Sequence, residues 1–347
     1  MQGSLPDFQL IESRNIVVKA GSQRIIFDPN KVHSRWRSER TLACISHAHS
    51  DHTVGFQSAL PKIATPATLD IYQALRGHSH NVQPIFPGDS ISLMDGGSLH
   101  IKPAGHMLGA AQFVLERKEA RLVYTGDFNL SSSLTIEGAI PIPCDVLLME
   151  ATYGRPDAVF PPREKVYSEI AEWTSQELKA RRIPAFQVYA AGKAQEVIRI
   201  LNTLLTIPVV VDSTIAKIGK VYQNHKIPLE FLDENTPEGR EVIKQGGHAY
   251  LTSKKIQQPR TFSGHKYTRA VTTGWAKLFP MKNVNKSFVL SAHADFHQLV
   301  EYLNEAQPHA VFITCGDRVT FGAVLEKLNI KQIIPQRRRQ LDLSDFI

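Results

Sequence analysis

Cysteine is scarce in this sequence. Only three cysteines occur among 347 residues, Cys44, Cys144 and Cys315, and they are far apart and odd in number. This usage argues against a framework of disulfide bonds, since such frameworks need an even set of cysteines in a short chain. A reducing compartment fits this usage, and we expect the protein to be cytoplasmic.

Long apolar runs are also missing. No stretch approaches the roughly 18 apolar residues that a membrane-spanning helix needs, so we expect no membrane association. Residues 1–7 have neither the basic end nor the apolar block of a signal peptide. Hydrophobic residues make up 42% of the chain, whose 347 residues are enough for one large domain or two ordinary ones.

Acidic residues are outnumbered, and the basic excess lies in the middle of the chain. The formal net charge is +7. Residues 155–280 contain 19 Lys and Arg against 12 Asp and Glu, which accounts for the whole excess, because the remainder has 21 of each. A basic region of this kind favours a polyanionic partner such as nucleic acid. Ordinary solubilising surface charge is the alternative.

Histidine and aspartate are concentrated in the segment His47-Ala-His49-Ser-Asp51-His52, which follows a short β-prone stretch. Imidazole nitrogen and carboxylate oxygen are donors that Zn²⁺ accepts. On a strand His47 and His49 point the same way, because side chains alternate with period two. They can therefore bind one ion, while the chain turns after Ser50 and directs Asp51 and His52 toward a second. A histidine-rich surface loop is the alternative.

Four further β-prone stretches also end in a candidate ligand or acid. They end at Asp28, His106, Asp127 and Glu150. Convergence at one edge of a sheet is the economical explanation for such residues scattered over a hundred positions. Residues 287–293 repeat the pattern and end at His293, and a last strand leads to Cys315.

The middle of the chain differs from both ends. Pro-rich sequence near 155–162 is followed by a helical pattern from Arg163 to about Arg182, and then by alternating strand and helix patterns. This composition predicts a compact α/β insert. Lys193 follows a glycine turn at the start of a predicted helix, where backbone amides favour anions.

Together these segments resemble the β-CASP nucleases, metallo-β-lactamase enzymes with an inserted second domain. The similarity covers nearly the whole chain and is greatest to the subgroup called ligase-associated DNA exonucleases. The segments that carry it are 47–52, 103–112, 125–127, 149–153, 189–195, 274–275 and 288–295. The resemblance implies an α/β fold, a metallo-β-lactamase αββα sandwich (1–154 and 281–347) with an inserted β-CASP α/β domain (155–280).

The resemblance also implies roles for individual residues. His47, His49 and His106 would hold one zinc ion, Asp51 and His52 a second, and Asp127 would lie between them, with manganese as an alternative to zinc. Asp28 would support the metal-binding loop from behind. Asp51, Glu150 and His293 would be catalytic, with Glu150 orienting His293 so that His293 protonates the leaving oxygen.

Cys315 departs from the family pattern. Most RNA-processing members have a histidine at this position that completes the second metal site, and the DNA-repair branch has an apolar residue there. A thiolate is a good zinc ligand, whereas a buried cysteine is often only a small apolar residue. We therefore leave two alternatives open: a zinc ligand in a two-ion site, or a packing residue beside a weakened second site.

The leading hypothesis is a zinc-dependent nuclease, a DNA exonuclease linked to repair. RNA processing is the second hypothesis, followed by a small-molecule hydrolase of the same fold and by a non-catalytic nucleic-acid-binding relative. Family resemblance implies association with a DNA ligase or helicase. The candidate nucleic-acid contacts are Lys193, Lys254, Lys255, Arg260 and His265.

Overall fold

The computed structural model describes residues 8–12, 15–31, 40–118, 120–256, 264–334 and 341–342. These described residues group into two compact units. The first is drawn from the ranges 1–131, 137–156 and 293–347, and the second from 132–136 and 157–292.

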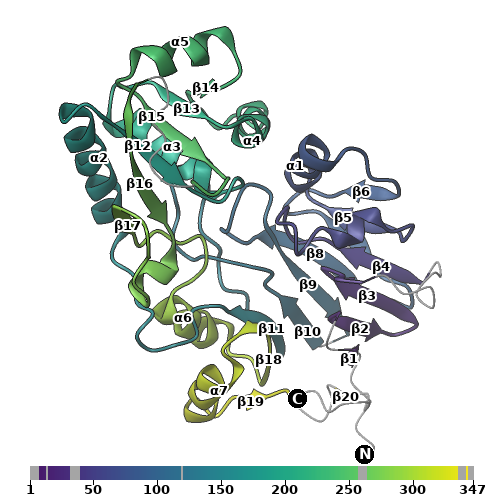
Figure 1. The fold of residues 1–347 in the computed structure, drawn as a ribbon. Helices are drawn as coiled ribbons and strands as arrows, with labels where there is room; N and C mark the ends of the chain where they lie inside the picture. The colour runs from purple at the N-terminus through teal and green to yellow at the C-terminus, as the bar shows by residue number, and fades with distance from the viewer. Residues whose placement is uncertain are drawn as a thin grey trace, which may run out of the picture. The chain divides into compact units, whose positions relative to one another are not determined.

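The first unit contains two β-sheets (Figure 1). Within the described residues one sheet has the strand order β20-β1-β2-β3-β4-β5-β6 and the other has the order β19-β18-β11-β10-β9-β8-β7. The strands of the first sheet are β1 (Phe8–Glu12), β2 (Val17–Ala20), β3 (Gln23–Phe27), β4 (Thr41–Cys44), β5 (Lys62–Ala64), β6 (Val82–Pro84) and β20 (Leu341–Asp342). Those of the second are β7 (Ser90–Ser92), β8 (Ser98–Pro103), β9 (Ala111–Arg117), β10 (Ala120–Tyr124), β11 (Val146–Ala151), β18 (Ala310–Gly316) and β19 (Lys331–Gln332).

The two sheets pack face to face around one hydrophobic core. Alternate residues of each strand enter this core, as the period of two along a strand requires. The first sheet contributes Ile25 and Phe27 from β3, and the second contributes Leu122 and Tyr124 from β10. The rings of Phe27 and Tyr124 stack across the sandwich, with centroids 4.6 Å apart.

Helices cover the sheets of this unit. A cluster of Ile45, Phe56 and Tyr72 joins the first sheet to the turn η2 (Val54–Gln57) and to α1 (Pro66–Arg76). On the second sheet, Tyr302 of α6 (Phe296–Ala306) donates a hydrogen bond from its hydroxyl to Gln112 Oε1 at 2.6 Å. The helix α7 (Arg318–Lys327) contacts β18 and β19. The predicted metallo-β-lactamase α/β sandwich is confirmed.

The second unit is built on a parallel sheet. Within the described residues its order is β14-β13-β15-β12-β16-β17, and all the pairings are parallel. Its strands are β12 (Arg182–Gln187), β13 (Val209–Val211), β14 (Leu232–Asp233), β15 (Ala249–Thr252), β16 (Lys266–Thr272) and β17 (Lys286–Phe288). Its helices are α2 (Arg163–Lys179), α3 (Lys193–Leu204), α4 (Ser213–Asn224), α5 (Pro237–Gln245) and the short η3 (Gly274–Lys277).

Residues 281–292 group with this second unit, although the sequence analysis placed them in the first domain. The reason is the edge strand β17, which pairs with β16 and aligns Ser287 with Val271. The compact unit therefore ends at Ala292, one residue before His293.

All three cysteines are free thiols, with Cys44 and Cys144 buried and Cys315 exposed. In the described part of the chain, no helix is both long enough and apolar enough to cross a membrane.

Candidate metal centre

The ends of several strands bring the predicted ligands together. In the first sheet β3 and β4 are parallel neighbours, so Asp28 and the segment after Cys44 leave the same edge. In the second sheet β10 and β11 are also parallel neighbours, which places the segment after Tyr124 beside the end of β11. A main-chain hydrogen bond of 2.9 Å from Ala111 N to Ser46 O joins the two edges.

His106 lies in the turn between the antiparallel strands β8 and β9. The preceding Gly105 has φ +69°, and a Cβ atom there would lie 2.2 Å from Asn129 O. Only glycine fits both the left-handed backbone and this close approach. Gly105 therefore packs the turn that carries His106 against the loop after Asp127.

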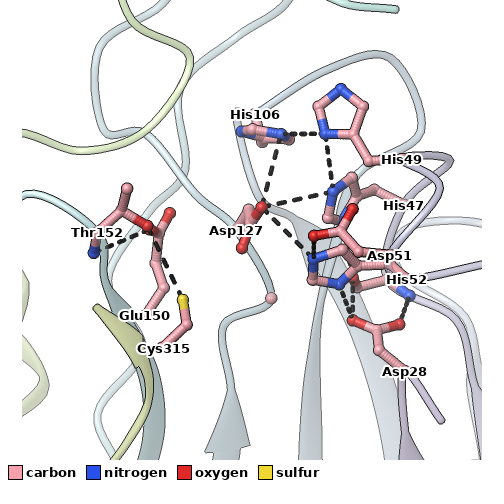
Figure 2. Close-up of polar contacts among 12 residues, drawn as sticks. Asp28, His47, His49, Asp51, His52, His106, Asp127, Glu150, Thr152 and Cys315 are labelled. Carbon is pink, nitrogen blue, oxygen red and sulfur yellow. Dashed lines mark hydrogen bonds and ion pairs between the residues drawn. The ribbon is translucent and has the colours of Figure 1, made fainter. Parts of the chain in front are cut away.

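Three imidazoles and a carboxylate form the densest group of donors (Figure 2). His49 Nδ1 lies 3.1 Å from both His47 Nε2 and His106 Nε2. Asp127 Oδ2 lies 3.5 Å from His47 Nε2 and 3.9 Å from His106 Nε2. His47 and His106 are buried, whereas His49 is partly exposed.

His52 and Asp51 also lie close to Asp127, with the ring of His52 packed against that of His47 (centroids 4.0 Å apart). His52 Nε2 is 3.6 Å from Asp127 Oδ2 and 3.5 Å from Asp51 Oδ2. The side chain of Asp51 is 77% exposed, whereas that of His52 is 16% exposed. The structure therefore brings both residues to the site, with Asp51 at its solvent side.

Asp28 lies behind this group and orients it. Its carboxylate accepts hydrogen bonds from Ser46 N (2.7 Å), Ser46 Oγ (2.5 Å), Tyr124 Oη (2.8 Å) and His52 Nδ1 (2.7 Å). Because His52 Nδ1 donates to Asp28, His52 Nε2 is left as the lone-pair nitrogen that faces Asp127. Asp28 also has φ +41°, in the left-handed region that few non-glycine residues adopt.

Glu150 and His293 form a second polar group next to Asp127. His293 Nδ1 lies 2.8 Å and 2.9 Å from the two carboxylate oxygens of Glu150, and 3.9 Å from Asp127 Oδ2. Glu150 is buried and also accepts hydrogen bonds from Phe128 N at 2.9 Å and from the hydroxyl of Thr152. A carboxylate held by that many donors fixes both the orientation and the protonation of the imidazole.

Hydrogen bonds to the loop after Asp127 hold the His293 segment. Ala294 N donates to Phe128 O at 2.7 Å, and Asn129 Nδ2 donates to His293 O at 2.7 Å. Asp295 then begins α6, accepting a hydrogen bond from Gln298 N.

The charges of these buried groups are strongly coupled. Burial and the neighbouring His52 hold the pKa of His47 well below its usual value, which keeps its ring neutral, the form that binds metals. Burial raises the pKa of Asp127 to about 6 against the opposing effect of His52. Burial also favours neutral His52, but the carboxylates of Asp127 and Asp28 outweigh it and raise the pKa of His52 to about 10. The environment of His52 therefore favours a positive charge, which a bound cation would supply in place of the proton on Nε2.

The chemistry and spacing of these donors fit a divalent ion. Tetrahedral zinc with Zn–N bonds of about 2.0–2.1 Å places neighbouring ligand atoms roughly 3.3–3.4 Å apart. The distances of 3.1 and 3.5 Å from His47 Nε2 to His49 Nδ1 and Asp127 Oδ2 lie close to that value. Imidazoles around a buried carboxylate, with the ring of His47 held neutral and more acids nearby, make a site that a cation would stabilise.

Cys315 is not a member of these donor groups, as far as the described residues show. Its Sγ is 3.8 Å from the hydroxyl oxygen of Thr152, whose hydroxyl bonds Glu150 (Figure 2). Desolvation, together with the negative charges of Glu150 and Asp127, raises the pKa of the Cys315 thiol. This position places the thiol next to the Glu150 support.

The candidate nucleic-acid contacts lie in different environments of the second unit. Lys254 and Lys255 are exposed after β15, with Lys254 Nζ 4.0 Å from Glu234 Oε1. His265 Nε2 is 3.0 Å from Lys244 O. Arg260 lies outside the described residues.

Lys193 is not at the surface that its sequence context predicts. Its side chain is buried, and Nζ donates a hydrogen bond of 2.7 Å to Leu290 O. Burial lowers the pKa of Lys193 to about 7. The amine therefore binds main chain inside the unit.

Three residues of the site were missed by sequence reasoning: Ser46 and Tyr124, which bond Asp28, and Thr152, which bonds Glu150. Strand alternation offers a signal for Tyr124, because it shares the core-facing side with Leu122. A tyrosine hydroxyl in such a position needs a polar partner.

The fold and the donor cluster together identify the family to which this chain belongs. Residues 14–186 match the family described as "Beta-lactamase superfamily domain". The chain belongs to the beta-lactamase superfamily, with β-CASP nucleases among its relatives.

Two curated relatives show how far the likeness extends. A protein named "Probable DNA ligase" from Opitutus terrae is 30% identical over 307 residues, a match covering 86% of this chain but 29% of that protein. This chain thus spans less than a third of that relative. An "RNase J-like protein" from Methanocaldococcus jannaschii is 24% identical, and the match covers 84% of this chain and 86% of that protein.

A solved structure of a protein of unknown function from Enterococcus faecalis is similar in fold. It covers 96% of this chain and 99% of its own, with a TM-score of 0.68 and 14% identity. At that level of identity the comparison supports the fold alone.

Proposed function

We propose that this chain is a zinc-dependent nuclease that hydrolyses phosphodiester bonds of nucleic acid. The observation that carries the proposal is the position of Asp127 Oδ2, which lies 3.5–3.9 Å from a nitrogen of each of four imidazoles: His47, His52, His106 and His293. A carboxylate in the middle of such a group is placed to be shared between cations.

In this proposal His47, His49 and His106 would hold one ion, Asp51 and His52 would hold a second, and Asp127 would contribute to both. Zinc is the first choice because imidazole and carboxylate form its usual hydrolytic sites, and manganese is the alternative. The bound ions would supply charge neutralisation at the phosphate oxygens and a lowered pKa for water.

We assign the role of general acid to His293, and Glu150 orients its imidazole. Glu150 bonds Nδ1 of the imidazole, so Nε2 is the atom from which His293 gives a proton to the leaving oxygen. Although burial opposes it, the charge of His293 lowers the pKa of Glu150, so Glu150 stays ionised and stabilises the imidazolium. We place the thiol of Cys315 outside the ligand set, beside the hydroxyl of Thr152 in a residue that is otherwise exposed.

Nucleic acid as the substrate is supported by charge and by exposed aromatic side chains. The ranges 132–136 and 157–292 contain 20 Lys and Arg against 12 Asp and Glu. Tyr189, 65% exposed, follows β12, and Trp275, 38% exposed, follows the adjacent parallel strand β16. Lys254 and Lys255 follow β15 on the other side of β12. Exposed aromatic faces beside lysines suit the stacked bases and phosphates of a single strand.

DNA is the preferred substrate in this proposal, with exonuclease action linked to repair. The support is the Opitutus terrae relative, in which a segment similar to this chain lies within a longer protein named as a DNA ligase. That arrangement also favours a DNA ligase, or a helicase of the same pathway, as the partner of this chain. The three free thiols fit a cytoplasmic location.

RNA processing is the second candidate. It is supported by the RNase J-like relative, of which this chain covers 86%. The two candidates place the same groups at the reacting phosphate and differ in the sugar they accept.

Cleavage of matched substrates tests the proposal. Metal content is measured first, and the protein is then given end-labelled single-stranded DNA, duplex DNA and RNA of one sequence, with zinc or manganese. Stepwise shortening of DNA in preference to RNA is the expected result. Faster cleavage of RNA would support RNA processing, and a metal-loaded protein that cleaves none of the three would overturn the nuclease assignment.

A further inference from the structure

Two basic residues of the second unit bind the chain immediately before His293: Lys193, which is buried, and Arg163, whose side chain is 13% exposed. Lys193 Nζ donates to Leu290 O at 2.7 Å, and Arg163 Nη2 donates to Ser291 O at 2.8 Å. Leu290 and Ser291 are themselves buried. The carbonyls of Leu290 and Ser291 are therefore each held by the side chain of a basic residue.

Glu196 completes this cluster. Its carboxylate is 5% exposed, pairs with the guanidinium of Arg163 and accepts a hydrogen bond of 2.7 Å from the hydroxyl of Tyr167. Lys193 and Arg163 are the first residues of α3 and α2, respectively. Two helix starts thus hold one short stretch of main chain.

A buried cluster of this kind is a costly way to stabilise a fold. Apolar residues of similar volume often stabilise as well or better, while removing one member of a buried ion pair is strongly destabilising. What the cluster provides, and apolar packing does not, is directional hydrogen bonding to two consecutive carbonyls. It therefore specifies the path of residues 290 and 291.

We propose that Lys193, together with Arg163 held by Glu196, positions the imidazole of His293 against Glu150. This inference rests on the proposed acid role of His293. The same segment is fixed after His293 by the hydrogen bonds of Ala294 and Asn129 to the loop after Asp127. The main chain is therefore held by hydrogen bonds both before His293, at residues 290 and 291, and after it, at Ala294.

The test compares Lys193→Met with Arg182→Met as a matched control. Arg182 also pairs with a carboxylate of the second unit, Glu177, but its ion pair does not include residue 290 or 291. Each variant is assayed on nucleic acid and on a nitrophenyl phosphodiester, whose leaving group needs no proton. A misplaced acid should lower kcat on nucleic acid by about 10- to 100-fold, with a much smaller loss on the nitrophenyl ester.

A double variant separates positioning from general damage. If Lys193 acts through His293, Lys193→Met added to His293→Ala should cause no further loss on nucleic acid. Equal losses on both substrates, or full additivity with His293→Ala, would overturn the positioning role. Arg163→Lys, which keeps the cation, serves as the milder second variant and should fall between wild type and Lys193→Met.

NMR of the imidazole rings tests whether Lys193 positions His293 without relying on an activity assay. In the zinc-loaded protein the ring resonances of His293 should shift or broaden in Lys193→Met and stay unchanged in Arg182→Met. Unchanged His293 resonances in Lys193→Met would refute the inference even if nucleic acid is cleaved. Conversely, a wild-type protein that cleaves no nucleic acid would refute the proposed function, while the NMR comparison would still decide whether the cluster positions His293.

Discussion

Asp28 offers the most direct test of how the site is supported. Its carboxylate gathers four donors from Ser46, Tyr124 and His52, with donor–acceptor distances of 2.5–2.8 Å. The change to make is Asp28→Asn, because asparagine tolerates the left-handed backbone at φ +41° and retains the shape of the side chain. The variant therefore removes the charge and one acceptor and leaves the backbone unstrained.

The cost of this change can be worked from the hydrogen bonds. Three donors meet at Oδ2, and the hydroxyls of Ser46 and Tyr124 can rotate to accept from an amide instead. His52 Nδ1 can accept only if its proton moves to Nε2, the nitrogen that faces Asp127. Hydrogen bonds to charged groups contribute about 1.5–3 kcal/mol each, so we expect about 2–4 kcal/mol of lost stability. Loss of such an orienting partner lowers metal affinity by about 10- to 100-fold.

Competition between the protein and a chelator for zinc measures the metal affinity. Urea unfolding followed by circular dichroism measures the stability. Tyr124→Phe is the matched control, because it removes one donor to Asp28 while leaving the charge and the His52 bond in place. We expect the control to lose about 0.5–1.5 kcal/mol and to retain its zinc affinity. Equal zinc affinities for Asp28→Asn and wild type would refute the argument that Asp28 sets the tautomer of His52.

Three further predictions concern residues away from Asp28. Cys315→Ala should leave zinc content and cleavage unchanged, whereas loss of about one zinc per chain would make the thiol a ligand. Neutralising Lys254 and Lys255 together should weaken nucleic-acid binding and reduce the dependence on salt by about one contact each, and an unchanged slope would assign them to solubility. The pKa of Lys193 is about 7 in the folded protein, against about 10.4 for a lysine in an unfolded chain. Between these two pH values the unfolded chain therefore binds one more proton than the folded protein. The stability of wild type relative to Lys193→Met should therefore rise with pH across that window, measured by urea unfolding, and a constant difference would show a charged amine in the folded state.

Local patterns were sufficient for most of the first unit. The sequence predicted a β-prone stretch that ends at Asp28, and the structure has β3 there. The strand before His47 and the strand before Asp127 were likewise predicted. They belong to different sheets, whose edges are joined by the hydrogen bond from Ala111 N to Ser46 O. The roles of these residues as ligands stay predictions that the experiments above address.

Long-range pairing explains what local patterns could not predict. The burial of Lys193 depends on Leu290, almost a hundred residues away, so a glycine turn at a helix start carried no sign of it. The membership of residues 281–292 in the second unit depends in the same way on the pairing of β17 with β16. The role of Thr152 could not be predicted either. Its hydroxyl bonds Glu150, two residues before it, but no sequence pattern distinguishes it from any other threonine near the end of a strand.

The central claim is that a metal-binding group centred on Asp127 hydrolyses nucleic acid. The most direct measurement compares wild type with Asp127→Asn after both are stripped of metal and reloaded with zinc or manganese. Wild type should lose cleavage on stripping and regain it on reloading, while Asp127→Asn, folded by circular dichroism, should stay at least about 10³-fold slower, a loss of about 4 kcal/mol in the barrier. Wild-type turnover by Asp127→Asn in metal-controlled buffer would contradict the claim.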